Sequence, residues 1–389
     1  MPIRKLTADF IFDGKRLHKN TVLVIQDDGL IVDCITNPDN KTLQDAEHYA
    51  GIISPGFVNA HCHLELSHLH KKIREHTGLV DFLLQVIQQR ETPLDGIQAA
   101  AVEADKYMYD EGIVAVGDIS NTDHTIPIKK NSNIYYHNFI EVMGFDPATA
   151  QQRLTSAMLT QKAFYDNGLP ASIAPHAPYS VSKELFKLID ALPQSLLSIH
   201  NQETEEENIF FREKKGDFLR LYQTLQIPII HFEASQKTSL QTYFPWLITP
   251  RNVILVHNVA TSLKEIQMIY NDDKHDFYFC ICANANQYIN EKMPSLQYYI
   301  DSCDRMVIGT DSLASNHQLS VLEELKTIQQ YYPSIGLEKL LQWSTYNGAK
   351  ALQVDDRFGS FGKGKKPGII QIGAVLNNNI EQAFVNRIV

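Results

Sequence analysis

The sequence lacks the features of secreted and membrane-spanning proteins. Its 389 residues include only five cysteines, without the spacing of a disulfide framework: Cys34, Cys62, Cys280, Cys282 and Cys303. This sparse set favours a reducing, intracellular compartment. No apolar stretch reaches the length of a membrane span, and the N-terminus lacks the basic-then-apolar order of a signal peptide. We therefore expect a soluble, cytoplasmic protein.

Basic charge is also scarce. The chain has 35 basic and 45 acidic residues, a formal net charge of −10 and 44% hydrophobic residues. Binding to nucleic acid or to an anionic membrane needs clustered lysine and arginine, so we expect neither as a partner. The expected partner is a small-molecule substrate, and the sequence leaves a homodimer open.

The middle of the chain alternates short apolar runs with longer amphipathic stretches. The runs predict strands at 56–62, 112–119, 134–141, 171–176, 195–201, 252–257, 276–282 and 305–310. The stretches predict helices near 79–90, 95–110, 147–166, 182–191, 203–224, 262–271, 318–331 and 336–347. Eight strands with intervening helices favour an α/β fold, a (β/α)8 TIM barrel whose strand ends converge on one face.

The two ends of the chain differ from this pattern. Short strands, several of them bounded by Asp-Gly turns, are predicted at 8–15, 20–29, 30–35, 367–376 and 382–389. We expect one small β-domain assembled from both termini. The predicted organisation is the N-terminal part of this domain at 1–55, a catalytic barrel at 56–360 and the C-terminal part at 361–389.

Four predicted strands end in residues that can bind a metal or move a proton. His61 and His63 close the first strand two residues apart and therefore on one face. Later strands end in His200, His257 and Asp311. Zinc and iron take imidazole nitrogen and carboxylate oxygen, and a catalytic ion leaves a position for water, whose pKa it lowers. We expect one divalent ion, zinc or else iron, bound by His61, His63, His200 and Asp311.

Two residues are candidates for proton transfer. Glu203 follows His200 by three residues and can move a proton from the attacking water to the substrate, although an acidic helix start is the alternative explanation for it. His257 is either a fifth ligand or a group that polarises the water and holds a developing oxyanion. Because a fifth ligand would crowd the ion, we assign His257 the second role, with Asp311 sharing the proton.

Substrate contacts are predicted near the same strand ends. His176 closes the fourth predicted strand, where a substrate contact is our first choice and a structural role the alternative. Glu65 shares the strand parity of His61 and His63 and is expected to face substrate. No lysine ends the fourth strand, so no carbamylated side chain is available there to bridge two metals. This favours a mononuclear site.

With these residues, the chain resembles the amidohydrolase superfamily and, within it, the mononuclear nucleobase and nucleoside deaminases. The matching segments follow the family's order over nearly the whole chain: 55–63, 175–180, 200–203, His257 and 309–316. The resemblance implies a distorted TIM barrel with a β-sandwich formed from both termini. It also implies a metal at the four predicted ligands, with Glu203 and His257 as the proton-transfer pair.

A finer resemblance is to the aminodeoxyfutalosine deaminases, carried by the segments 63–67, 176–181 and 256–258 and by the glutamates after His200. The chain departs from many relatives after the seventh strand, where it has Cys282-Ala-Asn-Ala-Asn286 in place of Cys-Pro-x-Ser-Asn. Asn286 keeps the last position and is a candidate substrate contact. The changed loop bears on substrate identity more than on chemistry.

We therefore predict a metal-dependent deaminase that replaces an exocyclic amine on a purine-type base or nucleoside by oxygen and releases ammonia. Aminodeoxyfutalosine is one candidate substrate. The rival functions are an amidohydrolase or chlorohydrolase acting on another cyclic C–N or C–Cl bond, and a catalytically silent binding scaffold. A purely structural subunit is disfavoured, because uncompensated buried charges are costly.

Overall fold

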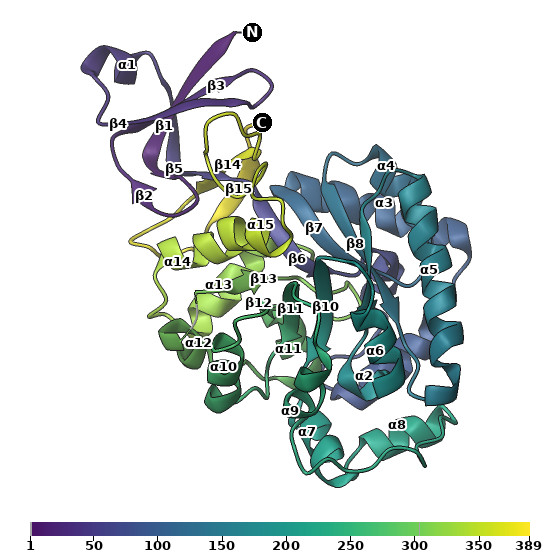
Figure 1. The fold of residues 1–389 in the computed structure, drawn as a ribbon. Helices are drawn as coiled ribbons and strands as arrows, with labels where there is room; N and C mark the ends of the chain where they lie inside the picture. Colours follow the sequence, from purple (N-terminus) through teal and green to yellow (C-terminus); the bar gives the residue numbers. More distant parts are fainter. Residues whose placement is uncertain (1, 303) are drawn as a thin grey trace.

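The computed structural model describes residues 2–302 and 304–389, so Cys303 lies outside the described residues. Figure 1 shows two parts: a β-sheet that carries both chain termini, and a larger α/β body in which helices surround parallel strands. Within the described part of the chain, no helix is both long and apolar enough to span a bilayer.

A seven-stranded sheet joins the two ends of the chain. Its order is β15-β14-β5-β1-β3-β4, with β2 paired to β1. Strands β1 and β5 run parallel, and the other pairs are antiparallel. The strands are β1 (Ile3–Phe12), β2 (Leu17–His18), β3 (Thr21–Gln26), β4 (Ile31–Thr36), β5 (Glu47–Pro55), β14 (Ile369–Gly373) and β15 (Phe384–Arg387). The expected sharing of one sheet by both termini is observed, while its folding into a sandwich stays a prediction.

Two four-stranded parallel sheets form the centre of the body, with the orders β6-β7-β8-β9 and β10-β11-β12-β13. Their strands are β6 (Phe57–Cys62), β7 (Ile113–Ser120), β8 (Tyr135–Val142), β9 (Ala171–Pro175), β10 (Leu196–Asn201), β11 (Asn252–His257), β12 (Asp276–Ile281) and β13 (Met306–Ile308). The sheets meet at both edges: the His200 amide donates to the His176 carbonyl, and the Asp311 amide donates to the His61 carbonyl. This is a TIM-barrel-like α/β fold, whose parallel strands direct their carboxyl ends to one face.

Helices connect most of these strands. They are α1 (Asn40–Gln44), α2 (Leu79–Gln89), α3 (Leu94–Asp110), α4 (Ile126–Asn131), α5 (Ala150–Asp166), α6 (Lys183–Asp190), α7 (Glu205–Glu213), α8 (Phe218–Thr224), α9 (Ser239–Tyr243), α10 (Leu263–Tyr270), α11 (Ala283–Asn290), α12 (Leu296–Ser302), α13 (Val321–Tyr331), α14 (Leu337–Gln342) and α15 (Gly348–Ala351). Shorter helical turns are η1 (Leu64–Leu69), η2 (Pro147–Thr149), η3 (Pro178–Ser180), η4 (Phe244–Trp246) and η5 (Trp343–Asn347). Several helices begin at side-chain caps; Ser262 and Glu265 cap α10 reciprocally.

The eight strands predicted in the middle of the chain are all observed, each within two residues of its predicted ends. The helix predicted at 203–224 is instead two helices, because Lys214 adopts a left-handed conformation (φ 53°) and ends α7. Strand β5 escapes prediction, since its first half is polar and mostly exposed and so lacks a strand's apolar pattern.

A continuous apolar core packs the helices against the strands. Phe279 of β12, Phe164 of α5 and Trp343 of η5 are almost completely buried within it. Burying one side chain of this size contributes roughly 1.5–3 kcal/mol relative to exposing it. This packing on their outer side holds the strands in place, so their carboxyl ends form a rigid platform for polar side chains.

Candidate metal centre and active-site cavity

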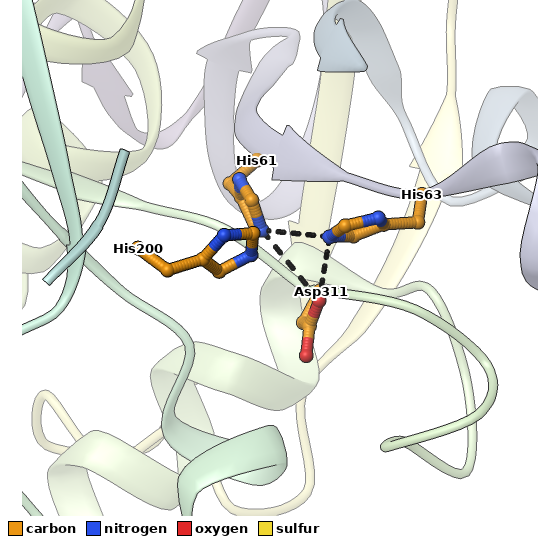
Figure 2. Close-up of side chains that lie close together, drawn as sticks. All are labelled: His61, His63, His200 and Asp311. Atoms are coloured by element: carbon orange, nitrogen blue, oxygen red, sulfur yellow. Dashed lines mark hydrogen bonds and ion pairs between the residues drawn. The ribbon is translucent and has the colours of Figure 1, made fainter. Parts of the chain in front are cut away.

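Four buried side chains converge at the carboxyl ends of the strands. Figure 2 shows His61, His63, His200 and Asp311 directed toward one another, and their candidate ligand atoms all lie within 4.8 Å of one another. The Nε2 atoms of His61 and His63 are 3.2 Å apart. Asp311 Oδ1 lies 3.5 Å from the first and 3.3 Å from the second. The fold therefore brings together the side chains predicted to share one site.

This donor set fits a divalent cation. Tetrahedral zinc with ligands at about 2.0–2.1 Å places neighbouring ligand atoms roughly 3.3 Å apart, close to the three distances above. Burial lowers the pKa of His63 to about 3 and that of His200 well below its usual value, so both rings are neutral and offer lone pairs. Three imidazoles and a carboxylate buried this close together would be costly without a cation between them.

Gly309 allows strand β13 to approach β6, the strand that carries His61. A Cβ atom at this position would lie 2.8 Å from the Cβ of His61, 2.8 Å from Cys280 Sγ and 2.9 Å from Cys282 Sγ. A larger residue would therefore push β13 away from β6 and β12. The close approach places Asp311, two residues later, beside His61.

Two of the polar strand-end residues have strained backbones. His257 and Asp311 adopt left-handed conformations, with φ of 74° and 57°. Such conformations cost non-glycine residues about 1–3 kcal/mol each and persist where the surrounding structure enforces them, often at functional sites. At Asp311 the turn is held by the amide, which donates to the His61 carbonyl at 3.1 Å.

Hydrogen bonds orient the candidate ligands. His200 Nδ1 donates to the His176 carbonyl at 2.8 Å, so its Nε2 is the nitrogen left for the metal. The Ser315 hydroxyl donates to Asp311 Oδ2 at 2.6 Å, which leaves Oδ1 facing the histidines. These bonds fix both side chains before any ion binds.

Glu203 and His257 lie beside the cluster. His257 Nε2 is 3.6 Å from Glu203 Oε1, and its Nδ1 donates to Asn286 Oδ1 at 2.9 Å. Burial raises the pKa of Glu203 to about 7, so its carboxyl group can take up and deliver a proton near neutral pH. Asn286 thus orients His257, while its direct contact with substrate stays a prediction.

A cavity of about 480 Å³ opens onto this cluster. Its floor includes three of the four candidate ligands, His63, His200 and Asp311, together with Glu203 and His257. Much of its wall is apolar and comes from helices α2 and α8 and the segment after α8: Leu79, Phe82, Leu83, Val86, Leu221, Tyr222 and Leu225. The volume is typical of small-molecule sites. The cavity thus combines a polar reaction centre with room for an apolar substituent.

Glu65 is buried but does not line this cavity. Its Oε2 accepts hydrogen bonds from the amides of Asn121 and Thr122 and from the Thr122 hydroxyl. Its Oε1 lies 3.4 Å from Arg90. The prediction that Glu65 faces substrate assumed that side chains still alternate as in a strand at this position. However, strand β6 ends at Cys62, and Glu65 lies in the helical turn η1. Its observed contacts hold the loop after β7, and a direct substrate contact stays a prediction.

His176 and Glu141 both line the cavity. Burial lowers the pKa of His176 to about 3, and its Nδ1 lies 2.7 Å from Ser180 Oγ. Glu141 is absent from the sequence-based assignments, although the strand predicted at 134–141 ends with it. Burial raises the pKa of its carboxyl group to about 7. The same strand-end rule that selected the histidines, applied to every strand, would have found this glutamate.

Comparison of the sequence with known proteins identifies one protein family and relatives named as deaminases. The model of the amidohydrolase family matches residues 52–387. The chain is 28% identical to an adenosine deaminase of Helicobacter pylori over 312 residues, which cover 78% of this chain and 75% of that protein. It is 27% identical to an aminodeoxyfutalosine deaminase of Nitratiruptor sp. over 296 residues, covering 73% of this chain and 69% of the other.

Solved structures resemble the chain over nearly its whole length. The aminofutalosine deaminase of Helicobacter pylori in complex with methylthio-coformycin matches with a TM-score of 0.80 at 25% identity, covering 97% of this chain and 94% of that one. An adenosine deaminase from Xanthomonas campestris with bound zinc matches with a TM-score of 0.73 at 18% identity, covering 97% and 88%. The second likeness shows a shared fold alone.

Proposed function

Because the chain belongs to the amidohydrolase family, we propose that it is a metal-dependent deaminase that removes an exocyclic amine from a purine-type base or nucleoside. Ammonia and the corresponding oxo compound are the products. The observation that carries this proposal is the convergence of one cation site and one acid–base pair on the floor of a single cavity. The relatives named adenosine deaminase and aminodeoxyfutalosine deaminase support the same reaction class.

In this proposal His61, His63, His200 and Asp311 hold one divalent ion, zinc in the first place and iron in the second. The imidazole-rich donor set and its spacing support this assignment. When bound, such an ion lowers the pKa of a water molecule and stabilises negative charge on oxygen.

The surrounding side chains move the protons. Glu203 takes a proton from the attacking water and delivers it to the ring nitrogen next to the reacting carbon, for which a pKa of about 7 suits it. His257 Nε2 faces the same carboxylate and holds the oxygen as it becomes negative, with Asp311 sharing the water's proton. A carbon–oxygen bond forms, the second proton of the water passes to the amine, the carbon–nitrogen bond breaks, and the amine leaves as ammonia.

The cavity wall bears on substrate size. A free base would leave most of the apolar surface from α2 and α8 uncovered, whereas a nucleoside with an apolar substituent on its sugar would bury it. This supports aminodeoxyfutalosine or a thio-adenosine over adenine as the substrate. His176 lines the same cavity and contacts the substrate in this proposal.

The finer predictions on the whole molecule are part of the same proposal. The two parallel sheets form one distorted (β/α)8 barrel at 56–360, and the terminal sheet forms a β-sandwich from 1–55 and 361–389. Backbone hydrogen bonds at both sheet edges support the barrel. We expect the protein to act in the reducing cytoplasm without nucleic-acid or membrane partners, as a monomer or a homodimer.

Ammonia release tests the function directly. Purified protein would be incubated with adenine, guanine, adenosine, methylthioadenosine and aminodeoxyfutalosine, and ammonia measured in a coupled assay. Deamination of one or more nucleosides, with close to one equivalent of metal per chain, is the expected result. Chloride release from a chlorinated triazine without ammonia release from any purine would favour the chlorohydrolase alternative. Metal-free protein that binds a nucleoside and leaves it unchanged would favour a silent scaffold.

A further inference from the structure

Glu141, at the end of β8, is a buried carboxylate that the proposed chemistry does not use. Its side chain is only 2% exposed and lines the cavity. Oε2 accepts a hydrogen bond from Asn121 Nδ2 at 2.8 Å, whereas Oε1 has no hydrogen-bond partner among the described residues. A buried polar atom without a partner is costly, which indicates that a bound molecule supplies one.

His176, beside Glu141 at the end of β9, presents a second acceptor. When the Ser180 hydroxyl donates to the Ala177 carbonyl, 3.1 Å away, His176 Nδ1 is the donor in its 2.7 Å contact with Ser180 Oγ. A neutral imidazole that donates from Nδ1 has an acceptor at Nε2. Glu141 Oε1 and His176 Nε2 thus suit a ligand that brings hydroxyl groups.

A second cation does not fit these atoms. Glu141, His176 and His200 lie close enough to be considered as a ligand set. However, His200 Nδ1, 3.7 Å from Glu141 Oε1, carries a hydrogen that it donates to the His176 carbonyl, and its Nε2 belongs to the first cluster. Two remaining ligands are fewer than zinc takes from a protein.

The position of this pair matches the shape of a nucleoside. The ring of His200 lies 4.8 Å from that of His176 and 5.4 Å from that of His257. The ring of His200 therefore lies between the two acceptors, Glu141 and His176, and the acid–base pair of Glu203 and His257. A nucleoside whose base reacts at Glu203 carries its sugar hydroxyls at about this separation.

We infer that Glu141 binds a ribose hydroxyl of the substrate and makes the enzyme selective for ribonucleosides over deoxynucleosides. The inference rests on the proposed function, since it takes the substrate to be a purine nucleoside. The hydroxyl donates to Oε1, whereas in Glu141→Gln the bond from Asn121 keeps the amide oxygen at the position of Oε2 and puts an amide nitrogen, which cannot accept, at the position of Oε1.

The test compares Glu141→Gln with the exposed control Glu184→Gln on α6, using adenosine, 2′-deoxyadenosine, 3′-deoxyadenosine and adenine. We expect Glu141→Gln to lower kcat/KM for adenosine about tenfold to a hundredfold, with less than about a threefold change for the analogue that lacks the bonded hydroxyl. The preference of the wild type for that hydroxyl would then disappear, while the control keeps it. Equal losses on all substrates would show a merely structural role and overturn the inference.

Binding and metal content separate this inference from the proposed function. Ammonia release with an unchanged ribose-to-deoxyribose ratio in Glu141→Gln overturns the inference alone. If no nucleoside is deaminated, the proposed function fails, and equilibrium titration with inosine and its two deoxy analogues decides the inference. Weaker binding of inosine to Glu141→Gln, with unchanged binding of one deoxy analogue, supports it. Two metal equivalents in the wild type and one in Glu141→Gln would overturn it in favour of a second cation site.

Discussion

The floor and the wall of the cavity are built on different principles. The floor consists of polar side chains at strand ends, held by strained backbones and by hydrogen bonds such as His200 to the His176 carbonyl. Much of the wall consists of apolar side chains from helices α2 and α8 and the segment after α8, which offer an apolar surface and a shape to a bound molecule. In the proposed function the chemistry therefore depends on rigid placement, whereas substrate choice depends on elements that can vary without disturbing it.

The largest expected effect comes from removing a ligand on the floor. His200→Ala should lose the bound ion and reduce turnover at least about a thousandfold, because the remaining ligands leave the cation site incomplete. Metal analysis and ammonia release measure the two losses. His48→Ala, an exposed histidine of the terminal sheet, is the matched control and should change neither. Full activity in His200→Ala would contradict the ligand assignment.

The next largest effect is expected from a substitution that separates β13 from β6 and β12, the strands beneath the floor. Gly309→Ala would place a methyl group 2.8 Å from the Cβ of His61, so we expect a loss of about 1–3 kcal/mol in the free energy of unfolding and weaker metal binding. Denaturant unfolding and metal titration measure these changes. At Gly336 a Cβ meets no atom within 4 Å, so Gly336→Ala is the control. Unaltered metal affinity in Gly309→Ala would show that the close approach is not required.

A smaller effect on activity is expected from removing a residue that orients a side chain of the floor without being a candidate ligand. Asn286→Ala frees the His257 ring, so we expect kcat to fall about tenfold to a hundredfold while the ion stays bound. Steady-state kinetics and metal content would be measured together. Asn284→Ala on the same helix removes a bond with Thr327 instead and should leave kcat close to that of the wild type. Loss of metal in Asn286→Ala would place Asn286 in the metal centre itself.

The smallest effect is expected on the wall. Leu221→Ala should raise KM about tenfold for a nucleoside with an apolar substituent, because roughly 1.5 kcal/mol of apolar contact is lost. Its kcat and its activity on the unsubstituted nucleoside should change little. Leu159→Ala on α5, a position that is 68% exposed, serves as control. A fall in kcat without a change in KM would contradict the separation of wall and floor.

The floor could be predicted from sequence because it follows a local rule. Parallel strands direct their carboxyl ends to one face. Residues far apart in sequence, such as His200 and Asp311, could therefore be placed together once their strands were recognised. Glu65 shows where that rule stops. The chain leaves the strand at Cys62 and enters a 3-10 turn, so side-chain alternation no longer gives direction.

The wall and the supporting contacts could not be predicted in the same way. Which helical face covers the cavity depends on how α2 and α8 pack, and amphipathic periodicity does not distinguish a face toward the core from a face toward a cavity. The bond between Asn286 and His257 joins two elements with no pattern that links them in sequence. Only the three-dimensional arrangement shows that this asparagine fixes an imidazole.

The terminal sheet has a consequence for the synthesis of the chain. Strand β14 pairs with β5, which leads directly into the strand carrying His61, so β5 obtains this neighbour only after all the residues between the two strands have been synthesised. Until then β5 presents an open edge, the type of surface that recruits other strands and leads to aggregation. Nascent chains truncated before residue 369 should therefore need chaperone protection more than the full-length protein does.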